Sequence, residues 1–310
     1  MAAITAALVN ELRQKTGAGM MQCKKALTEA DGDLQEAEVV LRKTMVGKAV
    51  GRSERTASEG LILAKVSDDK HIGVIVELNS ETDFVARNDD FKALGKSIVT
   101  RIADFAAGTV PTDLDALLAA PMGDTTVGEA VTNAGGRIGE KIALSRFERF
   151  GAPEGNAVAA YVHNPSGSGD EGGKVGVLVE VAGSDDKDAL ATLAREVALH
   201  ISSSNPMVLA ESDVPAEVIE KEREIALAQA QNDPKMAGKP EAAINAMVNG
   251  RVRVFLEESV LLKQSYVRDP AITISDLVKK TAGASIVRFV RFKLGEIQAD
   301  AAGTEGEVAA

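Results

Sequence analysis

The feature of this sequence that most restricts its fold is an internal duplication. Residues 71–78 (HIGVIVEL) match residues 174–181 (KVGVLVEV) further along the chain. Both segments show the period-two alternation that is typical of a strand with one buried face. A shorter strand is expected before each of them, at 61–66 and at 158–163. The chain therefore carries the same pair of strands twice.

The duplication extends to the end of each copy. An amphipathic helix is expected after each strand pair, at 90–105 and 187–202, and both copies close with Arg-Phe-x-Arg-Phe, at 146–150 and 288–292. We interpret this closing pattern as a strand with alternate Phe buried and Arg exposed. Strand, strand, helix, small helix, strand is an α+β unit, so we predict a duplicated α/β core with an antiparallel sheet in each copy.

Two insertions break the symmetry between the copies. The spacing between matching positions falls by four residues across 79–88, so the first copy has four extra residues directly after its long strand. The second copy holds a larger insertion at about 214–262, with two apolar stripes of helical period separated by a turn rich in Asn, Pro and Gly. These stripes predict an inserted helical hairpin that projects from the core.

The first 46 residues have the pattern of a small module of three helices. Thr16-Gly17-Ala18-Gly19 breaks the first helix, and Asp33 can cap the third, which we expect to end at Val46. Little in the next twelve residues could be buried, so we expect a flexible linker. The predicted division is a head at 1–46, a linker at 47–58, core subdomains at 59–151 and 152–296, and a tail at 297–310.

Composition excludes several classes of function. The net charge of −11 argues against binding nucleic acid, an affinity that depends on Lys and Arg neutralising phosphates. No stretch approaches the roughly 18 apolar residues of a membrane span. The single Cys23 cannot form an internal disulfide, which suits a reducing, cytoplasmic location. With two Tyr, eight Phe and no Trp, the position of each Phe is informative.

Motifs for cofactors, metals and catalysis fail on spacing. The glycines at 167, 169 and 172 precede a strand instead of opening a helix, so a hairpin loop explains them better than a dinucleotide site. The P-loop-like segment 135–141 has Glu140 between Gly and Lys. The three His, at 71, 163 and 200, are scattered. We therefore predict no cofactor, no metal and no catalytic residue, and we interpret Cys23 as a small buried residue in preference to a reactive thiol.

Phe84 differs from the other aromatic residues. It lies in the polar insertion 79–88, beside Asp83. One interpretation is that Phe84 continues the buried strand. The other is that it is an exposed wedge, which would gain roughly 1.5–3 kcal/mol on entering a partner's pocket.

Three motifs resemble the bacterial translation elongation factor Ts family. They are Thr82-Asp83-Phe84-Val85, the head segment 16–27 (TGAGMMQCKKAL) and the two Gly-Val-x-Val-Glu strands. The resemblance extends over about residues 1–296. It implies a ubiquitin-associated-like head, a core of two subdomains with an inserted helical hairpin, and no chemistry of the chain's own.

The family resemblance also implies a function. It is guanine-nucleotide exchange on the GTPase elongation factor Tu, whose magnesium ion is dislocated by Thr82, Asp83, Phe84 and Val85. Met20, Met21 and Lys24 on the head, together with His163, would contact the same partner, although the loop after His163 is enlarged in this chain. Neither nucleic acid nor membrane is expected as a partner, and a homodimer or a 2:2 complex stays open. A scaffold protein that binds through head and hairpin alone is the alternative, and an enzyme using Cys23 is a third.

Overall fold

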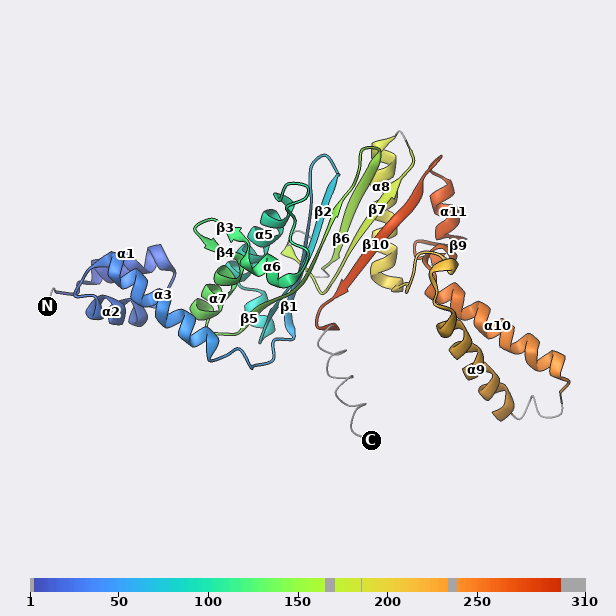
Figure 1. Ribbon diagram of the computed structural model, residues 1–310, viewed down its shortest axis with the longest axis horizontal. Coiled ribbons are helices and arrows are strands. Elements are labelled where there is room, and N and C mark those ends of the chain that lie inside the picture. The colour runs from blue at the N-terminus through green and yellow to red at the C-terminus, as the bar shows by residue number, and fades with distance from the viewer. Residues whose placement is uncertain (1–2, 165–170, 185, 234–238, 297–310) are drawn as a thin grey trace.

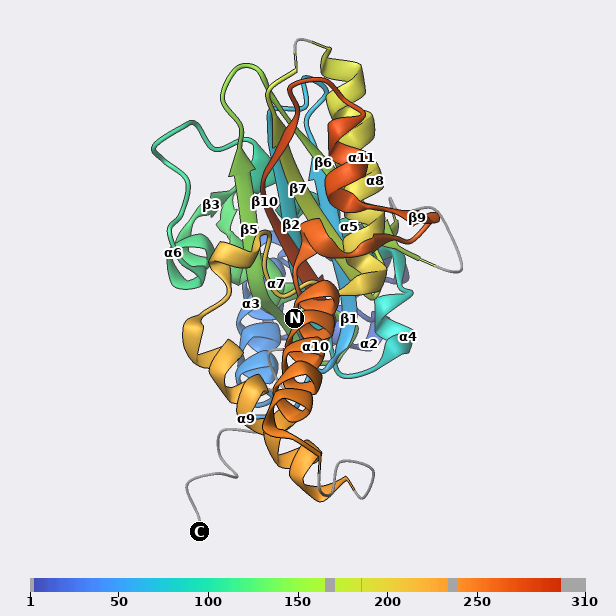
Figure 2. The same ribbon diagram turned by 90° about the vertical axis from the view of Figure 1, so that its right-hand side faces the viewer.

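The computed structural model describes residues 3–164, 171–184, 186–233 and 239–296. Figure 1 shows an elongated molecule with a helical head at one end, two sheets with their helices in the middle and a helical hairpin at the other end. The view along the long axis, in Figure 2, shows the strands of the two sheets running side by side. The fold is α+β with antiparallel sheets, as the duplication predicted.

The head consists of three helices around a small apolar core. Thr5 caps the first helix by accepting a hydrogen bond from the Leu8 amide, and Gly17 ends it at φ 66°, a conformation that favours glycine. The third helix continues to Val50, so the prediction that a linker begins at 47 was wrong by four residues. The helices are α1 (Ala6–Thr16), α2 (Met20–Glu29) and α3 (Leu34–Val50).

The first repeat follows the predicted order. Its two-residue strands β3 and β4 form a small hairpin that the sequence analysis did not anticipate. Its elements are β1 (Glu59–Val66), β2 (Ile72–Ser80), α4 (Asp83–Ala86), α5 (Asp89–Ala103), α6 (Leu114–Ala119), β3 (Pro121–Met122), β4 (Thr125–Thr126), α7 (Val127–Ile138) and β5 (Ile142–Gly151).

The second repeat has the same plan with the helical insertion between α8 and β8. The insertion consists of two antiparallel helices, α9 and α10, which project from the core in Figure 1. Part of the turn between them lies outside the described residues, as do the tail at 297–310 and most of the loop 164–173 with two of its glycines. The elements are β6 (Asn156–His163), β7 (Val175–Ala182), α8 (Lys187–Ser204), α9 (Ala216–Asn232), α10 (Glu241–Ser259), β8 (Ser265–Tyr266), β9 (Asp269–Thr273), α11 (Ile274–Lys279) and β10 (Ser285–Lys293).

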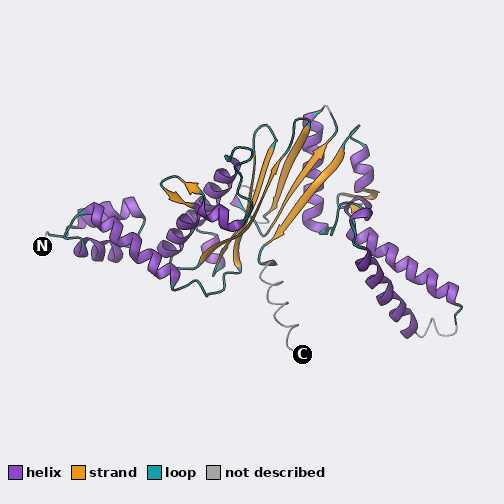
Figure 3. Ribbon diagram, in the orientation of Figure 1, coloured by secondary structure: helices purple, strands orange, loops and turns teal. Residues whose placement is uncertain are grey.

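Each repeat builds one three-stranded sheet, in the orders β1-β2-β5 and β10-β7-β6. Helices cover one face of each sheet, while the other two faces meet and enclose a shared apolar layer (Figure 3). The matching glycines of the repeat lie in this layer. A Cβ on Gly73 would lie 2.4 Å from Val158 Cγ1, and one on Gly176 would lie 2.5 Å from Ile62 Cγ2. Both glycines therefore permit a close approach of the two sheets.

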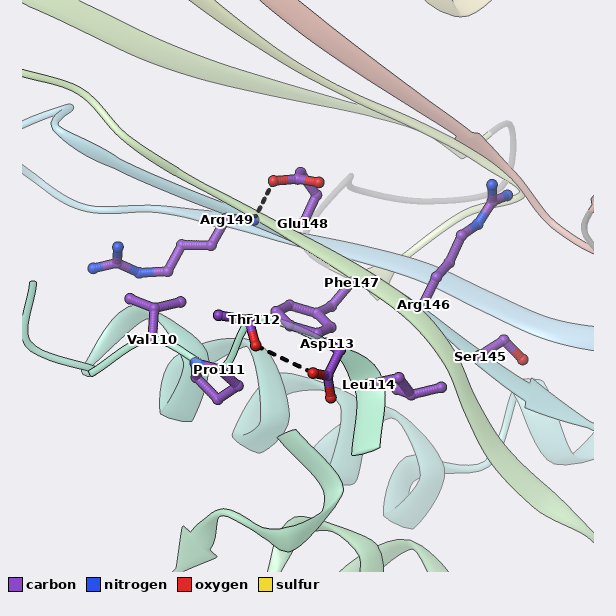
Figure 4. Close-up of a pocket in the computed structure, with 10 residues that line it drawn as sticks. All are labelled: Val110, Pro111, Thr112, Asp113, Leu114, Ser145, Arg146, Phe147, Glu148 and Arg149. Atoms are coloured by element: carbon purple, nitrogen blue, oxygen red, sulfur yellow. Dashed lines mark hydrogen bonds between the residues drawn. The ribbon is translucent and has the colours of Figure 1, made fainter. Parts of the chain in front are cut away.

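The interpretation of the closing strands as buried Phe alternating with exposed Arg was wrong. Phe147 and Phe150 are three residues apart, so they lie on opposite faces of β5. Phe150 is buried in the layer between the sheets, whereas Phe147 packs on the helical side, where Figure 4 shows it directed toward Thr112 and Asp113. Because both faces of the sheet are covered, both faces of the strand carry an aromatic side chain.

Candidate functional site

The insertion after β2 forms one turn of helix that presents Phe84 to solvent. Thr82 caps this turn by accepting a hydrogen bond from the Val85 amide at 3.5 Å. Val85 and Ala86 are buried in the core of the first repeat, while Phe84 is 77% exposed. The structure therefore excludes the interpretation of Phe84 as a continuation of the buried strand. The turn therefore exposes the Phe84 side chain to water while Val85 and Ala86 fix the turn in the core.

Asp83 lies beside Phe84 and is paired on the surface. Its Oδ2 accepts a hydrogen bond from Arg87 Nη2 at 2.8 Å, and 76% of the Arg87 side chain and 44% of the Asp83 side chain are exposed. An ion pair so open to water contributes little to stability. Asp83 can therefore exchange Arg87 for a group on a partner at small cost.

The turn is fastened to the other end of the repeat by Glu140. The Thr82 amide donates to Glu140 Oε2 at 3.0 Å, and the Thr82 hydroxyl donates to Oε1 at 2.8 Å. The adjacent Glu81 accepts a hydrogen bond from the Lys141 amide at 2.6 Å, which together with Arg55 lowers the pKa of its carboxyl. Sequence reasoning missed Glu140, which was used only to reject a P-loop. The pairing of Ser80 with Ile142 brings residues 82 and 140 together, and only knowledge of this register could have found it.

The head exposes the three residues that the resemblance selected. Met20 is 59% exposed and Met21 is 75% exposed at the start of α2, and Lys24 is exposed one turn later. The opposite face of α2 is buried and includes Cys23, whose Sγ lies 3.6 Å from the Ala18 carbonyl oxygen. Cys23 is thus a buried core residue, as the simpler interpretation held.

His163 is the last residue of β6 and belongs to the second repeat. It is exposed, and its Nδ1 lies 3.3 Å from the Tyr161 hydroxyl. Within the described residues, no hydrogen bond, ion pair or ring contact joins His163 to the Thr82–Val85 turn or to the head residues. These three groups lie on separate elements, namely β6, the turn around α4, and α2. Such an arrangement suits contact with a macromolecule at several points.

The described part of the chain offers little that resembles a binding or catalytic site for a small molecule. A cavity of about 300 Å³ lies along β5 (Figure 4). Its Thr112 hydroxyl donates to Asp113, and its Glu148 accepts from the Arg149 amide, so these polar groups are engaged within the protein. No group of three or more His, Cys, Asp or Glu among the described residues could hold a metal ion. None of the described helices is long and apolar enough to cross a membrane.

Comparison with known proteins gives one consistent result. The family model described as elongation factor TS matches residues 81–296. The chain is 45% identical over 294 residues to elongation factor Ts of Alkalilimnicola ehrlichii, covering 95% of this chain and 93% of the relative. It is 45% identical over 318 residues to elongation factor Ts of Agrobacterium fabrum, covering 100% and 99%, and 44% identical over 294 residues to that of Methylococcus capsulatus, covering 94% and 92%.

Proposed function

Because the chain belongs to the elongation factor Ts family and is therefore a factor of translation elongation, we propose that it is the guanine-nucleotide exchange factor of the GTPase elongation factor Tu. In this proposal the chain acts in the cytoplasm and by binding alone. It uses no catalytic group and no cofactor of its own. Its partner is a protein, and neither nucleic acid nor membrane takes part.

The observation that carries the proposal is the exposed Phe84 on its anchored turn. Leaving a Phe side chain 77% in water is unfavourable unless a partner covers it, and burial in a pocket contributes roughly 1.5–3 kcal/mol. Thr82 and Val85 hold the turn in place, one through hydrogen bonds and the other in the core. We assign Phe84 as a wedge that enters the GTPase beside its nucleotide.

Asp83 supplies the second part of the proposed mechanism. Magnesium in nucleotide sites is held by few protein ligands and by the phosphates, so a shift of those ligands weakens both ion and nucleotide. A carboxylate brought next to the ion on the wedge would disturb this coordination. The four residues Thr82, Asp83, Phe84 and Val85 would thus dislocate the magnesium ion and promote release of GDP.

The remaining exposed groups extend the contact. Met20, Met21 and Lys24 would pack on the GTPase from the head, and His163 would reach it from the second repeat. Only the nucleotide-free conformation of the GTPase would make the contacts at all three places at once. The chain would therefore bind that conformation most tightly and lower the affinity of the GTPase for GDP.

Equilibrium binding tests this proposal. If GDP and the chain compete through one conformational equilibrium, GDP must weaken the chain's affinity for the GTPase by the same factor as the chain weakens the affinity for GDP. We expect calorimetric titration to give a much lower Kd for nucleotide-free elongation factor Tu than for its complex with GDP and Mg²⁺. Equal affinities for the two forms would contradict the proposal.

A further inference from the structure

We propose that Glu140 is a positioning residue for residues 82–86, the turn that carries Phe84, which we call the wedge turn. We further propose that the segment 135–141 around Glu140 holds this turn and the head in one fixed arrangement. The consequence for exchange rests on the proposed function, whereas the positioning itself rests on the contacts of Glu140 and Lys141. Glu140 touches neither nucleotide nor magnesium in this account. It acts through Thr82.

The contact between Glu140 and Thr82 restrains the residue that begins the wedge turn. Two donors of Thr82, its amide and its hydroxyl, point at the two oxygens of one carboxylate. The Thr82 carbonyl in turn accepts from the Ser80 hydroxyl at 2.8 Å. Every polar group of Thr82 is therefore engaged, and hydrogen bonds to a carboxylate are stronger than neutral ones. Phe84 follows only two residues later.

The next residue, Lys141, ties the same segment to the chain that leaves the head. Its Nζ donates to the carbonyl oxygens of Ser53 and Arg55, at 2.6 and 2.7 Å, while its amide donates to Glu81. Arg55 in turn forms an ion pair with Glu81 at 3.2 Å, so Arg55, Glu81 and Lys141 are all connected to one another. The residues after α3 are thus bound both to Lys141 and to the start of the wedge turn, and they are not the free linker that the composition suggested.

Helix α7, which ends shortly before Glu140, also packs directly against the head. Helix α3 passes so close to it that a Cβ on Gly136 would lie 2.7 Å from Met45 Cβ. Next to it, Arg137 packs against Gly17 in the turn that ends α1, and its Nε lies 3.6 Å from Asp90 at the start of α5. One helix and the turn after it therefore contact the head, the linker, the wedge turn and the helix that follows.

This arrangement gives Glu140 a specific role. Without its carboxylate, the Thr82 amide and hydroxyl lose their acceptor, and the wedge turn must be ordered when the partner binds instead of beforehand. A glutamine has the same size but offers one acceptor oxygen and turns an NH₂ group toward a donor. Glu140→Gln thus removes the restraint with little change in volume.

The matched control is Glu154→Gln. Glu154 is an exposed carboxylate between β5 and β6 that makes no side-chain hydrogen bond or ion pair within the described residues, and its substitution changes the net charge equally. Both variants and the wild type are first compared by thermal unfolding. A second test variant, Thr82→Val, keeps the shape of the side chain but removes the hydroxyl that both donates to Glu140 and accepts from the Val85 amide, so its amide exchange should be at least as fast as that of Glu140→Gln.

Two measurements on the same samples test the inference. Hydrogen–deuterium exchange of the peptide over residues 80–88 is followed in the free chain, where we expect Glu140→Gln to exchange about tenfold faster than wild type and Glu154→Gln to match wild type. Release of labelled GDP from elongation factor Tu is then measured at saturating factor, alone and in a Phe84→Ala background. We expect Glu140→Gln to slow release in the native background and to add little once Phe84 is removed.

The outcomes distinguish the positioning role of Glu140 from the proposed exchange function. Unchanged amide exchange in Glu140→Gln overturns the inference. So does full additivity with Phe84→Ala, since Glu140 would then act by another route. A wild-type chain that fails to accelerate GDP release contradicts the proposed function instead, and the amide exchange then decides the positioning role on its own.

Discussion

The guanidinium carbon of Arg146 lies 4.1 Å from the centre of the Phe292 ring, so the closing strand of the first repeat contacts that of the second. The reverse contact has the same distance, with Arg288 over Phe150. Each Arg also pairs with a buried glutamate of its own repeat, Arg146 with Glu77 at 2.8 Å and Arg288 with Glu180 at 2.7 Å. The two copies of Arg-Phe-x-Arg-Phe thus form a reciprocal junction between the sheets.

The first prediction concerns this junction. Arg146→Met leaves the Glu77 carboxylate, which is 1% exposed, without its ionic partner, and breaking such a buried pair costs about 3–5 kcal/mol. We expect a loss in that range in the free energy of unfolding, measured with urea. Arg253→Met, which removes an exposed ion pair with Glu257 on α10, is the control and is expected to cost under about 0.5 kcal/mol. Equal losses in the two variants would show that the junction carries no special weight.

The second prediction concerns the close approach of the sheets. Gly73→Ala places a methyl group 2.4 Å from Val158 Cγ1, and the repacking that follows costs roughly 1–3 kcal/mol. Gly250→Ala is the matched control, because a Cβ there has open space around it in helix α10 and alanine favours helix by roughly 0.5–1 kcal/mol. We therefore expect Tm to fall in the first variant and to rise slightly in the second. A rise in both would refute the packing argument.

The third prediction concerns a buried histidine in the second repeat. The Nε2 of His200 lies 2.9 Å from Gln264 Oε1, its Nδ1 accepts from the Val267 amide, and burial lowers the pKa of the imidazole. A lowered pKa means that the unfolded chain binds the proton more readily than the folded one. This contribution to stability is thus complete above the ordinary value of about 6.5 and is lost as the pH falls below it.

Thermal unfolding at pH 7.5 and pH 5.5 checks the histidine. Wild type is expected to lose more stability over this interval than His200→Gln, which has no proton to gain. The comparison uses the difference between the two pH values, so a general loss of stability in the variant does not obscure it. Parallel pH profiles would argue against a contribution from His200.

Features with local signals could be predicted from the sequence. The repeated strands identified both sheets, and the polar insertion singled out Phe84. Each of these depends on the period or chemistry of a few neighbouring residues. The three-helix head and the helical hairpin were found for the same reason.

Features that depend on distant pairing could not be predicted. The burial of Phe150 depends on the second sheet, which covers what would otherwise be the solvent side of β5. The contact of Glu140 with Thr82 follows from the register of β2 and β5, which no short segment contains. Helix α3 runs past its expected end, and α7 packs against it through Gly136.

Release of labelled GDP from elongation factor Tu tests whether Phe84 acts as a wedge in nucleotide exchange. Wild-type chain is expected to accelerate release. Phe84→Ala should lose about tenfold to a hundredfold of that acceleration, the equivalent of one buried Phe side chain. Its Tm should stay unchanged, because Phe84 is 77% exposed in the free chain. Equal acceleration by wild type and Phe84→Ala would contradict the wedge, and no acceleration by wild type would contradict the exchange function itself.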